Sequence, residues 1–125
     1  MAFLNHKGQL EQPAIHSVPF THGLTPDTSF DTLLPRILSD EHLRGDARLV
    51  VTGHTGTRGD DEANLRLSEE RAELIAEMLV EEGVSKDAIL AVGVGGTEPL
   101  QRQEGESDRS YQRRLPRVDV VITNP

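Results

Sequence analysis

The feature that most constrains the fold of this chain is a strand, a helix and a second strand in succession between residues 48 and 94. Residues 48–53 contain the run Leu49, Val50 and Val51, which is apolar enough for a central strand of a sheet. Residues 89–94 form a second apolar run, and a helical pattern lies between the two. Because parallel strands joined by a helix nearly always form a right-handed crossover, this segment predicts two parallel strands covered by one helix.

The connecting helix is predicted to begin at Ser68. Serine is a good N-cap, Glu69 and Glu70 suit the positive end of the helix dipole, and Gly83 marks the stop. The apolar positions of this segment predict one buried face, made of Leu67, Ala72, Leu74, Ile75, Met78 and Leu79.

Three further elements are predicted around this core. Residues 15–20 are a short strand, residues 27–38 are a helix that Pro35 is expected to kink or split, and residues 118–122 are the last strand. The charged stretch 101–114 is expected to be a solvated loop. The resulting order, β-α-β-α-β-loop-β, predicts an α/β (α+β) two-layer sandwich with helices packed on one face of a mixed sheet.

The length of the chain bounds its domain organisation. A chain of 125 residues suffices for one modest core. Residues 1–14 show no periodicity, so we expect a flexible leader or linker there and a single domain over residues 15–125.

The composition disfavours several classes of function. A net charge of −8 and an aromatic content of 3% argue against binding to nucleic acid or to an anionic membrane surface, and no apolar run is long enough to cross a membrane. The chain has no cysteine, and its five histidines lack the spacing of a zinc site, so no metal is expected. We expect no cofactor and no catalytic activity, since neither a complete phosphate loop nor a catalytic triad pattern is present.

Five short motifs occur in order and at compact spacing. They are Gly53-His54-Thr55, Asn64, the run from Leu67 to Ala72, Gly83-Val84, and the run from Gly93 to Pro99. Together they resemble the OmpA-like C-terminal domain, the peptidoglycan-associated module of Pal lipoproteins and flagellar motor stator proteins, over residues 15–123. The resemblance implies a non-catalytic periplasmic domain that binds the stem peptide of peptidoglycan, usually through diaminopimelate.

The resemblance also implies a set of ligand-binding residues. The diaminopimelate side chain ends in an ammonium and a carboxylate on one carbon, so its receptor needs an anion and a cation. The family's arginine corresponds to Arg71, whose alternative interpretation is an exposed helix residue paired with Glu69, Glu70 or Asp60. Asn64 matches a ligand contact and can equally be a turn-forming residue, and Thr55 is expected at the mouth of the site.

The sequence departs from the family pattern at two places. Gly56 stands where the family has the aspartate that pairs the ligand's ammonium; Asp60 and Asp61 are either a substitute or turn-capping residues. In the closing motif Arg117 keeps the second arginine, whereas Leu115 and Pro116 replace an asparagine and the first arginine.

Two functional hypotheses remain open at this stage, and a third belongs to another class. The first is a cell-wall tether of an envelope assembly of the secretion, pilus or motor type. The second is a degenerate copy that has lost diaminopimelate and acts as a protein–protein interaction module. The third is a hydrolase that uses His54 with a loop carboxylate. The first two imply a periplasmic location, with the domain tethered by a membrane segment outside this chain. The sequence alone leaves a cytoplasmic location open as the alternative.

Overall fold

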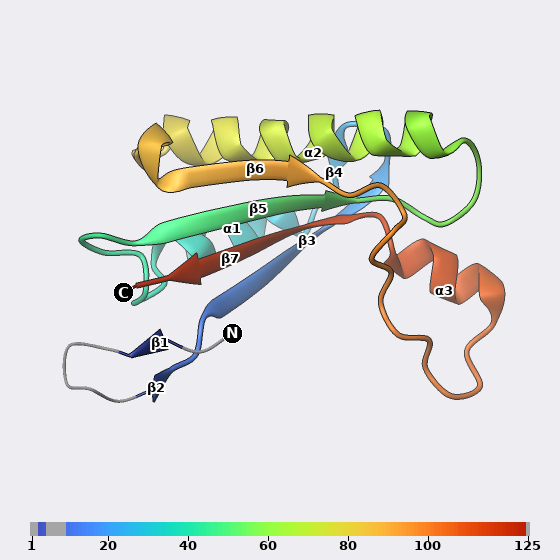
Figure 1. Ribbon diagram of the computed structural model, residues 1–125, viewed down its shortest axis with the longest axis horizontal. Coiled ribbons are helices and arrows are strands. Elements are labelled where there is room, and N and C mark those ends of the chain that lie inside the picture. Colours follow the sequence, from blue (N-terminus) through green and yellow to red (C-terminus); the bar gives the residue numbers. More distant parts are fainter. Residues whose placement is uncertain (1–2, 5–9, 125) are drawn as a thin grey trace.

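A five-stranded mixed sheet forms the centre of the computed structural model, which describes residues 3–4 and 10–124 (Figure 1). The strand order is β4-β3-β7-β5-β6. The strands are β3 (Ala14–His22), β4 (Thr25–Pro26), β5 (Arg48–His54), β6 (Ile89–Gly93) and β7 (Arg117–Thr123). Strands β5 and β6 are parallel, whereas β7 is antiparallel to both β3 and β5. The predicted parallel pair is therefore confirmed, and the last strand of the chain lies between β3 and β5.

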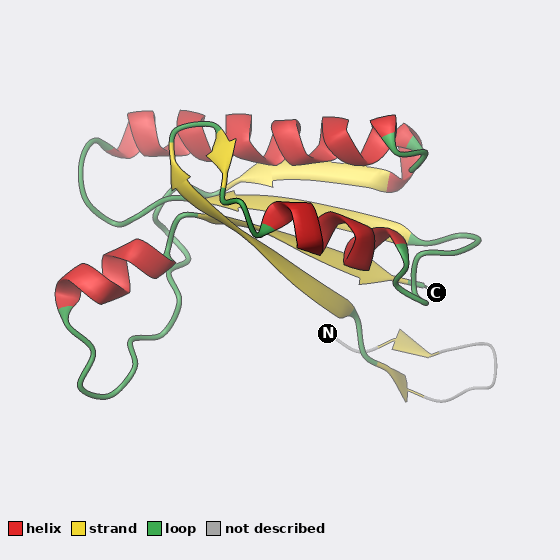
Figure 2. Cartoon of the chain, turned by 180° about the vertical axis from the view of Figure 1, so that it is seen from behind, coloured by secondary structure: helices red, strands yellow, loops and turns green. Residues whose placement is uncertain are grey.

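The two long helices pack on the same face of this sheet. Helix α1 (Phe30–Leu38) crosses in front of the strands in Figure 2, and α2 (Asp61–Glu81) lies along β5 and β6. A single core joins inward residues of β3, β5 and β7 to both helices; among them are Val18, Leu49, Val51, Val118, Val120, Ile122, Ile37, Ile75 and Leu79. The predicted two-layer α/β sandwich is confirmed.

Helix α2 begins two turns earlier than the capping pattern indicates. Its N-cap is Asp60, whose carboxylate accepts a hydrogen bond from the Ala63 amide at 2.9 Å. The prediction of Ser68 as the cap is wrong, because Ser68 is fully buried within the helix. The predicted stop is confirmed, since Gly83 follows the helix with a φ of 104°.

Two glycines let α2 approach the sheet closely. A Cβ at Gly53 would lie 1.9 Å from the carbonyl oxygen of Ser68, and one at Gly93 would lie 2.3 Å from the Glu69 amide nitrogen. The Ser68 hydroxyl donates to the Leu65 carbonyl and accepts from the Gly95 amide at 2.8 Å. This contact fixes the middle of α2 against the ends of β5 and β6.

Two other local expectations are corrected. Pro35 does not split α1, which is continuous from Phe30 to Leu38, and a kink at Pro35 stays a prediction. Pro35 leaves the Asp31 carbonyl without its helical partner, and both residues are exposed to solvent. The stretch 101–114 is not a plain solvated loop, since its second half forms α3 (Asp108–Arg114), at one end of the sheet in Figure 1.

The remaining elements are short. Strand β1 (Phe3–Leu4) pairs antiparallel with β2 (Leu10–Glu11), and a 3₁₀ turn, η1 (Lys86–Ala88), precedes β6. The flexibility of residues 1–14 as a leader stays a prediction, although β3 begins within that range, at Ala14. In the described ranges no helix is both long and apolar enough to cross a membrane.

Candidate ligand-binding site

Arg71 lies in the middle of α2 and points toward the end of β5. It is only 4% exposed, its Nε donates to the Gly23 carbonyl at 2.9 Å, and its Nη1 donates to the His54 carbonyl at 3.0 Å. The guanidinium carbon lies 5.3 Å from the centre of the Phe20 ring. The alternative of an exposed arginine paired with neighbouring carboxylates is therefore wrong.

The charge of Arg71 is not balanced by an acidic side chain. Within residues 3–4 and 10–124 it takes part in no ion pair, and burial lowers the pKa of its guanidinium. Its Nη2 has no hydrogen-bond partner there, and no described side-chain nitrogen is both fully buried and unbonded. Nη2 is therefore accessible to solvent, and a buried cation with an accessible donor is suited to an incoming carboxylate.

Gly56, which the sequence motifs align with the family's aspartate, lies beneath a side chain from α3. The Oε1 of Gln112 accepts from the Thr57 amide at 3.1 Å, and its Nε2 donates to the Thr57 hydroxyl at 2.6 Å. A Cβ at Gly56 would come within 2.8 Å of that Oε1. Gln112 therefore occupies the space into which a side chain at position 56 would extend.

The polar groups of Thr55, Asn64 and Asp60 bond to the protein itself. Thr55 is buried; its hydroxyl donates to the Gly56 carbonyl and its amide to the Gly95 carbonyl. Asn64 lies in the first turn of α2, and its Nδ2 donates to the Arg58 carbonyl at 2.9 Å. Asp60 caps the same helix. These contacts hold the loop that connects β5 to α2.

Arg117 differs from Arg71 in having an acidic partner. It is 6% exposed, and its Nε donates to Oδ2 of Asp119 at 3.2 Å. The ring of His54 lies 3.3 Å from the same oxygen, and Ser17 donates to the other oxygen at 2.7 Å. Although burial alone raises the pKa of Asp119, the hydrogen bonds from His54 and Ser17 and the charge of Arg117 hold it below its ordinary value. This cluster secures the strand ends beside Arg71.

Known proteins resemble this chain in both sequence and fold. The sequence model of the OmpA family matches residues 31–113, which is well over half of the chain and includes α2, Gly56 and Arg71. The chain belongs to the OmpA family. The domains of this family are non-catalytic, so the hydrolase hypothesis is set aside.

The OmpA fold is also evident in solved structures. The peptidoglycan-associated lipoprotein from Burkholderia pseudomallei superposes with a TM-score of 0.72 at 26% identity, over 86% of this chain and 89% of that one. The C-terminal domain of Helicobacter pylori MotB superposes with a TM-score of 0.71 at 17% identity, over 90% and 87% of the two chains. The second likeness concerns the fold alone.

Curated relatives share the OmpA segment but are longer proteins. The peptidoglycan-binding protein ArfA from Mycobacterium tuberculosis is 35% identical over 77 residues, which are 62% of this chain and 23% of that protein. The peptidoglycan-associated lipoprotein from Legionella pneumophila is 38% identical over 69 residues, or 55% and 39% of the two chains. This chain therefore spans less than half the length of either relative.

Two residues of this OmpA domain were beyond the reach of sequence reasoning. Gln112 lies 56 positions after Gly56, in a helix that the sequence pattern does not indicate. Asp119 reads in the sequence as the polar position of an alternating strand, and only the pairing of β7 with β3 and β5 brings it to Ser17 and His54. The local signal that could have indicated a role for Asp119 is that it is the only acidic residue in an apolar strand.

Proposed function

We propose that this chain is a periplasmic, non-catalytic domain that binds the stem peptide of peptidoglycan through diaminopimelate and so anchors an envelope assembly to the cell wall. The observation that carries the proposal is Arg71, a buried cation that the described residues provide with carbonyl partners but with no anion. The names of ArfA and of the two lipoproteins support the same ligand class.

The chemistry of Arg71 fits the carboxylate of the diaminopimelate side chain. Two of its nitrogens are fixed by the Gly23 and His54 carbonyls, so the guanidinium is held in one orientation before the ligand arrives. A carboxylate at Nη2 would balance the buried charge and add a charge-assisted hydrogen bond. In this proposal Thr55, Asn64 and Asp60 hold the β5–α2 connection beside Arg71, and Arg117 is bonded to Asp119.

A specific observation favours the alternative, a domain that has lost diaminopimelate and acts as a protein–protein interaction module. Gly56 provides no carboxylate for the ligand's ammonium, and Gln112 fills the space above it. Truncating one member of a charge pair that holds a ligand costs about 2–5 kcal/mol, or roughly thirty-fold to several thousand-fold in affinity. The two functions therefore differ in whether the stem peptide binds at all.

The test is an amide NMR titration with the tripeptide L-Ala-γ-D-Glu-meso-diaminopimelate. The wild type is expected to show saturable shifts around Arg71 and at the end of β5. Arg71→Gln, which keeps hydrogen-bond donors but removes the charge, is expected to lose at least about tenfold in affinity. Arg66→Gln is the matched control, because Arg66 is exposed on the same helix.

Gly56→Asp distinguishes the two functions. Only the flexible end of Gln112 opposes a Cβ at this position, so the variant is expected to fold. Tripeptide binding by the wild type, weakened in Arg71→Gln, supports the tether. If the wild type shows no chemical-shift changes and Gly56→Asp binds the tripeptide, the tether is contradicted and the interaction module is favoured.

A further inference from the structure

A cleft of about 720 Å³ lies between the end of β3 and helix α3. Its apolar lining includes Phe20 and Pro116, and its charged side chains are Asp27, Arg109 and Arg113. The guanidinium groups of Arg109 and Arg113 make no hydrogen bond or ion pair within the described part of the chain. The cleft thus combines an apolar surface with charges that are free to meet a ligand.

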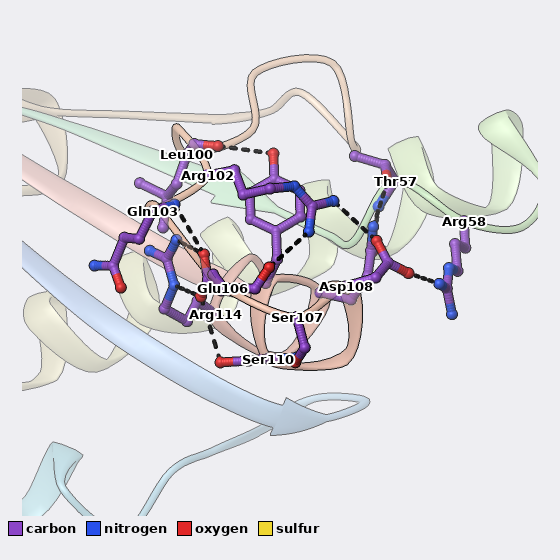
Figure 3. A network of polar contacts seen from close by, with 12 residues as sticks. Thr57, Arg58, Leu100, Arg102, Gln103, Glu106, Ser107, Asp108, Ser110 and Arg114 are labelled. Atoms are coloured by element: carbon purple, nitrogen blue, oxygen red, sulfur yellow. Dashed lines mark hydrogen bonds and ion pairs between the residues drawn. The ribbon is translucent and has the colours of Figure 1, made fainter.

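The other charges of this segment are already paired. Figure 3 shows Arg114 bonded to both carboxylate oxygens of Glu106, at 2.6 and 2.7 Å, and Asp108 between Arg102 and Arg58. Arg109 and Arg113 are four residues apart on α3, so their like charges are neighbours and repel each other. Helix α3 therefore has one face neutralised within the protein and another that presents two positive charges to the cleft.

Asp27 is the anion of the same cleft. Its Oδ2 accepts from the Ser29 amide at 3.0 Å and its Oδ1 from the Thr21 hydroxyl at 3.4 Å. The hydrogen bond from the Ser29 side chain is the strongest cause that lowers the pKa of the Asp27 carboxyl, followed by the bond from the Ser29 amide, and the Thr21 hydroxyl contributes as well. No ion pair to Asp27 is present in the described ranges, and each carboxylate oxygen can accept a second hydrogen bond. Asp27 can therefore hold an ammonium.

The cleft adjoins the residues discussed above. Phe20, whose ring lies against Arg71, forms part of its wall, and so does Gln112, which covers Gly56. Phe20 and Gln112 therefore connect the cleft to the surroundings of Arg71 and Gly56. Asp27 is the one acid among the residues that line the cleft, and it carries the kind of charge that is absent at Gly56.

We propose that this cleft is the second half of the stem-peptide site. In it Asp27 holds the side-chain ammonium of diaminopimelate, while Arg109 and Arg113 hold the α-carboxylate of the D-glutamate. The inference rests on the proposed function. It assigns to this chain an acid from the β4–α1 connection and two arginines from α3. One ammonium at Asp27 and one carboxylate held by both arginines account for the three charges of the cleft.

The test compares two peptides by isothermal titration calorimetry. One is L-Ala-γ-D-Glu-meso-diaminopimelate, and the other carries an amide in place of the D-glutamate α-carboxylate. Amidation is expected to weaken binding to the wild type by about tenfold or more, and binding to the Arg109→Gln/Arg113→Gln variant by less than about twofold. Arg48→Gln/Arg66→Gln is the matched control, because it removes the same charge at two exposed positions away from the cleft.

Asp27 is tested separately with Asp27→Asn, whose side-chain oxygen still accepts from the Ser29 amide. Its affinity for the unmodified tripeptide is expected to fall by about tenfold, whereas Asp46→Asn, at an exposed position, is expected to bind like the wild type.

The outcomes separate the two proposals. If the wild type and the Arg109→Gln/Arg113→Gln variant bind the tripeptide equally and lose the same affinity on amidation, the assignment of the cleft is overturned and the proposed function stands. A wild type that binds neither peptide overturns the proposed function and the cleft with it. Loss of the amidation penalty only in the double α3 variant supports both.

Discussion

At the scale of the residue, the chain contains two buried arginines with different surroundings. Arg117 has the Asp119 carboxylate, whereas Arg71 has two carbonyls and an aromatic ring. A carbonyl stabilises a guanidinium without cancelling its charge, so the charge of Arg71 is left unbalanced whereas that of Arg117 is balanced by Asp119. This difference depends on partners from distant strands and cannot be read from the two arginines themselves.

Ser68 is a residue whose role also depends on distant partners. Ser68→Ala is expected to lower the free energy of unfolding by about 1–3 kcal/mol, because the buried Gly95 amide loses its acceptor. Chemical denaturation measures the difference. Ser85→Ala is the control, since Ser85 is exposed and its side chain makes no capping bond, and a change within about 0.5 kcal/mol is expected. Equal effects of the two substitutions would contradict the structural role of Ser68.

At the scale of the element, α3 is held by charge more than by apolar packing. The helix has seven residues, none of them fully buried, and is capped by Ser107. Glu106 joins it to the preceding loop through Arg114, the Gln103 amide and the Ser110 hydroxyl (Figure 3). A helix this short is not stable by propensity alone, so these contacts decide whether it forms.

The Glu106 contacts predict an acid-sensitive α3. The hydrogen bond from Arg114 is the largest of several contacts that together lower the pKa of Glu106 from 4.5 to about 2, the others being those from Gln103 and Ser110. A carboxyl with a depressed pKa stabilises the folded state above its unfolded pKa, and this contribution is lost as the pH falls from about 4.5 toward 2. Melting temperatures across this range are therefore expected to fall less steeply for Glu106→Gln than for the wild type.

The control for acid sensitivity is Glu104→Gln. Glu104 is exposed in the same loop and makes no hydrogen bond or ion pair in the described part of the chain, so its variant is expected to follow the wild type. Glu106→Gln and wild-type curves of equal slope would show that the Arg114 contact does not stabilise α3.

At the scale of the whole molecule, the last strand of the chain holds the sheet together. Strand β7 pairs with β3 along one edge and with β5 along the other, so the domain closes only when residues 117–123 reach the centre. Its inward residues Val118, Val120 and Ile122 are fully buried. The two ends of the domain sequence are thus neighbours in the core.

This topology predicts a gradient of amide exchange. Amides of β7 are expected to exchange most slowly, near the rate set by global unfolding, because both edges of the strand are paired. Amides of α3 and β4 are expected to exchange faster by orders of magnitude, since few buried contacts hold those elements. Hydrogen exchange followed by NMR measures both groups, and rapid exchange throughout β7 would contradict its central place.

The sequence by itself determined the β5-α2-β6 crossover, the stop at Gly83 and the family motifs, because periodicity and turn chemistry are properties of neighbouring residues. The tertiary structure alone decided which charges are paired. Ser68 is buried because Gly53 and Gly93, having no side chains, allow α2 to pack closely against the sheet, and the packing of α3 places Gln112 over Gly56. Such contacts arise when elements from opposite ends of the chain pack together, and the local pattern carries no record of that packing.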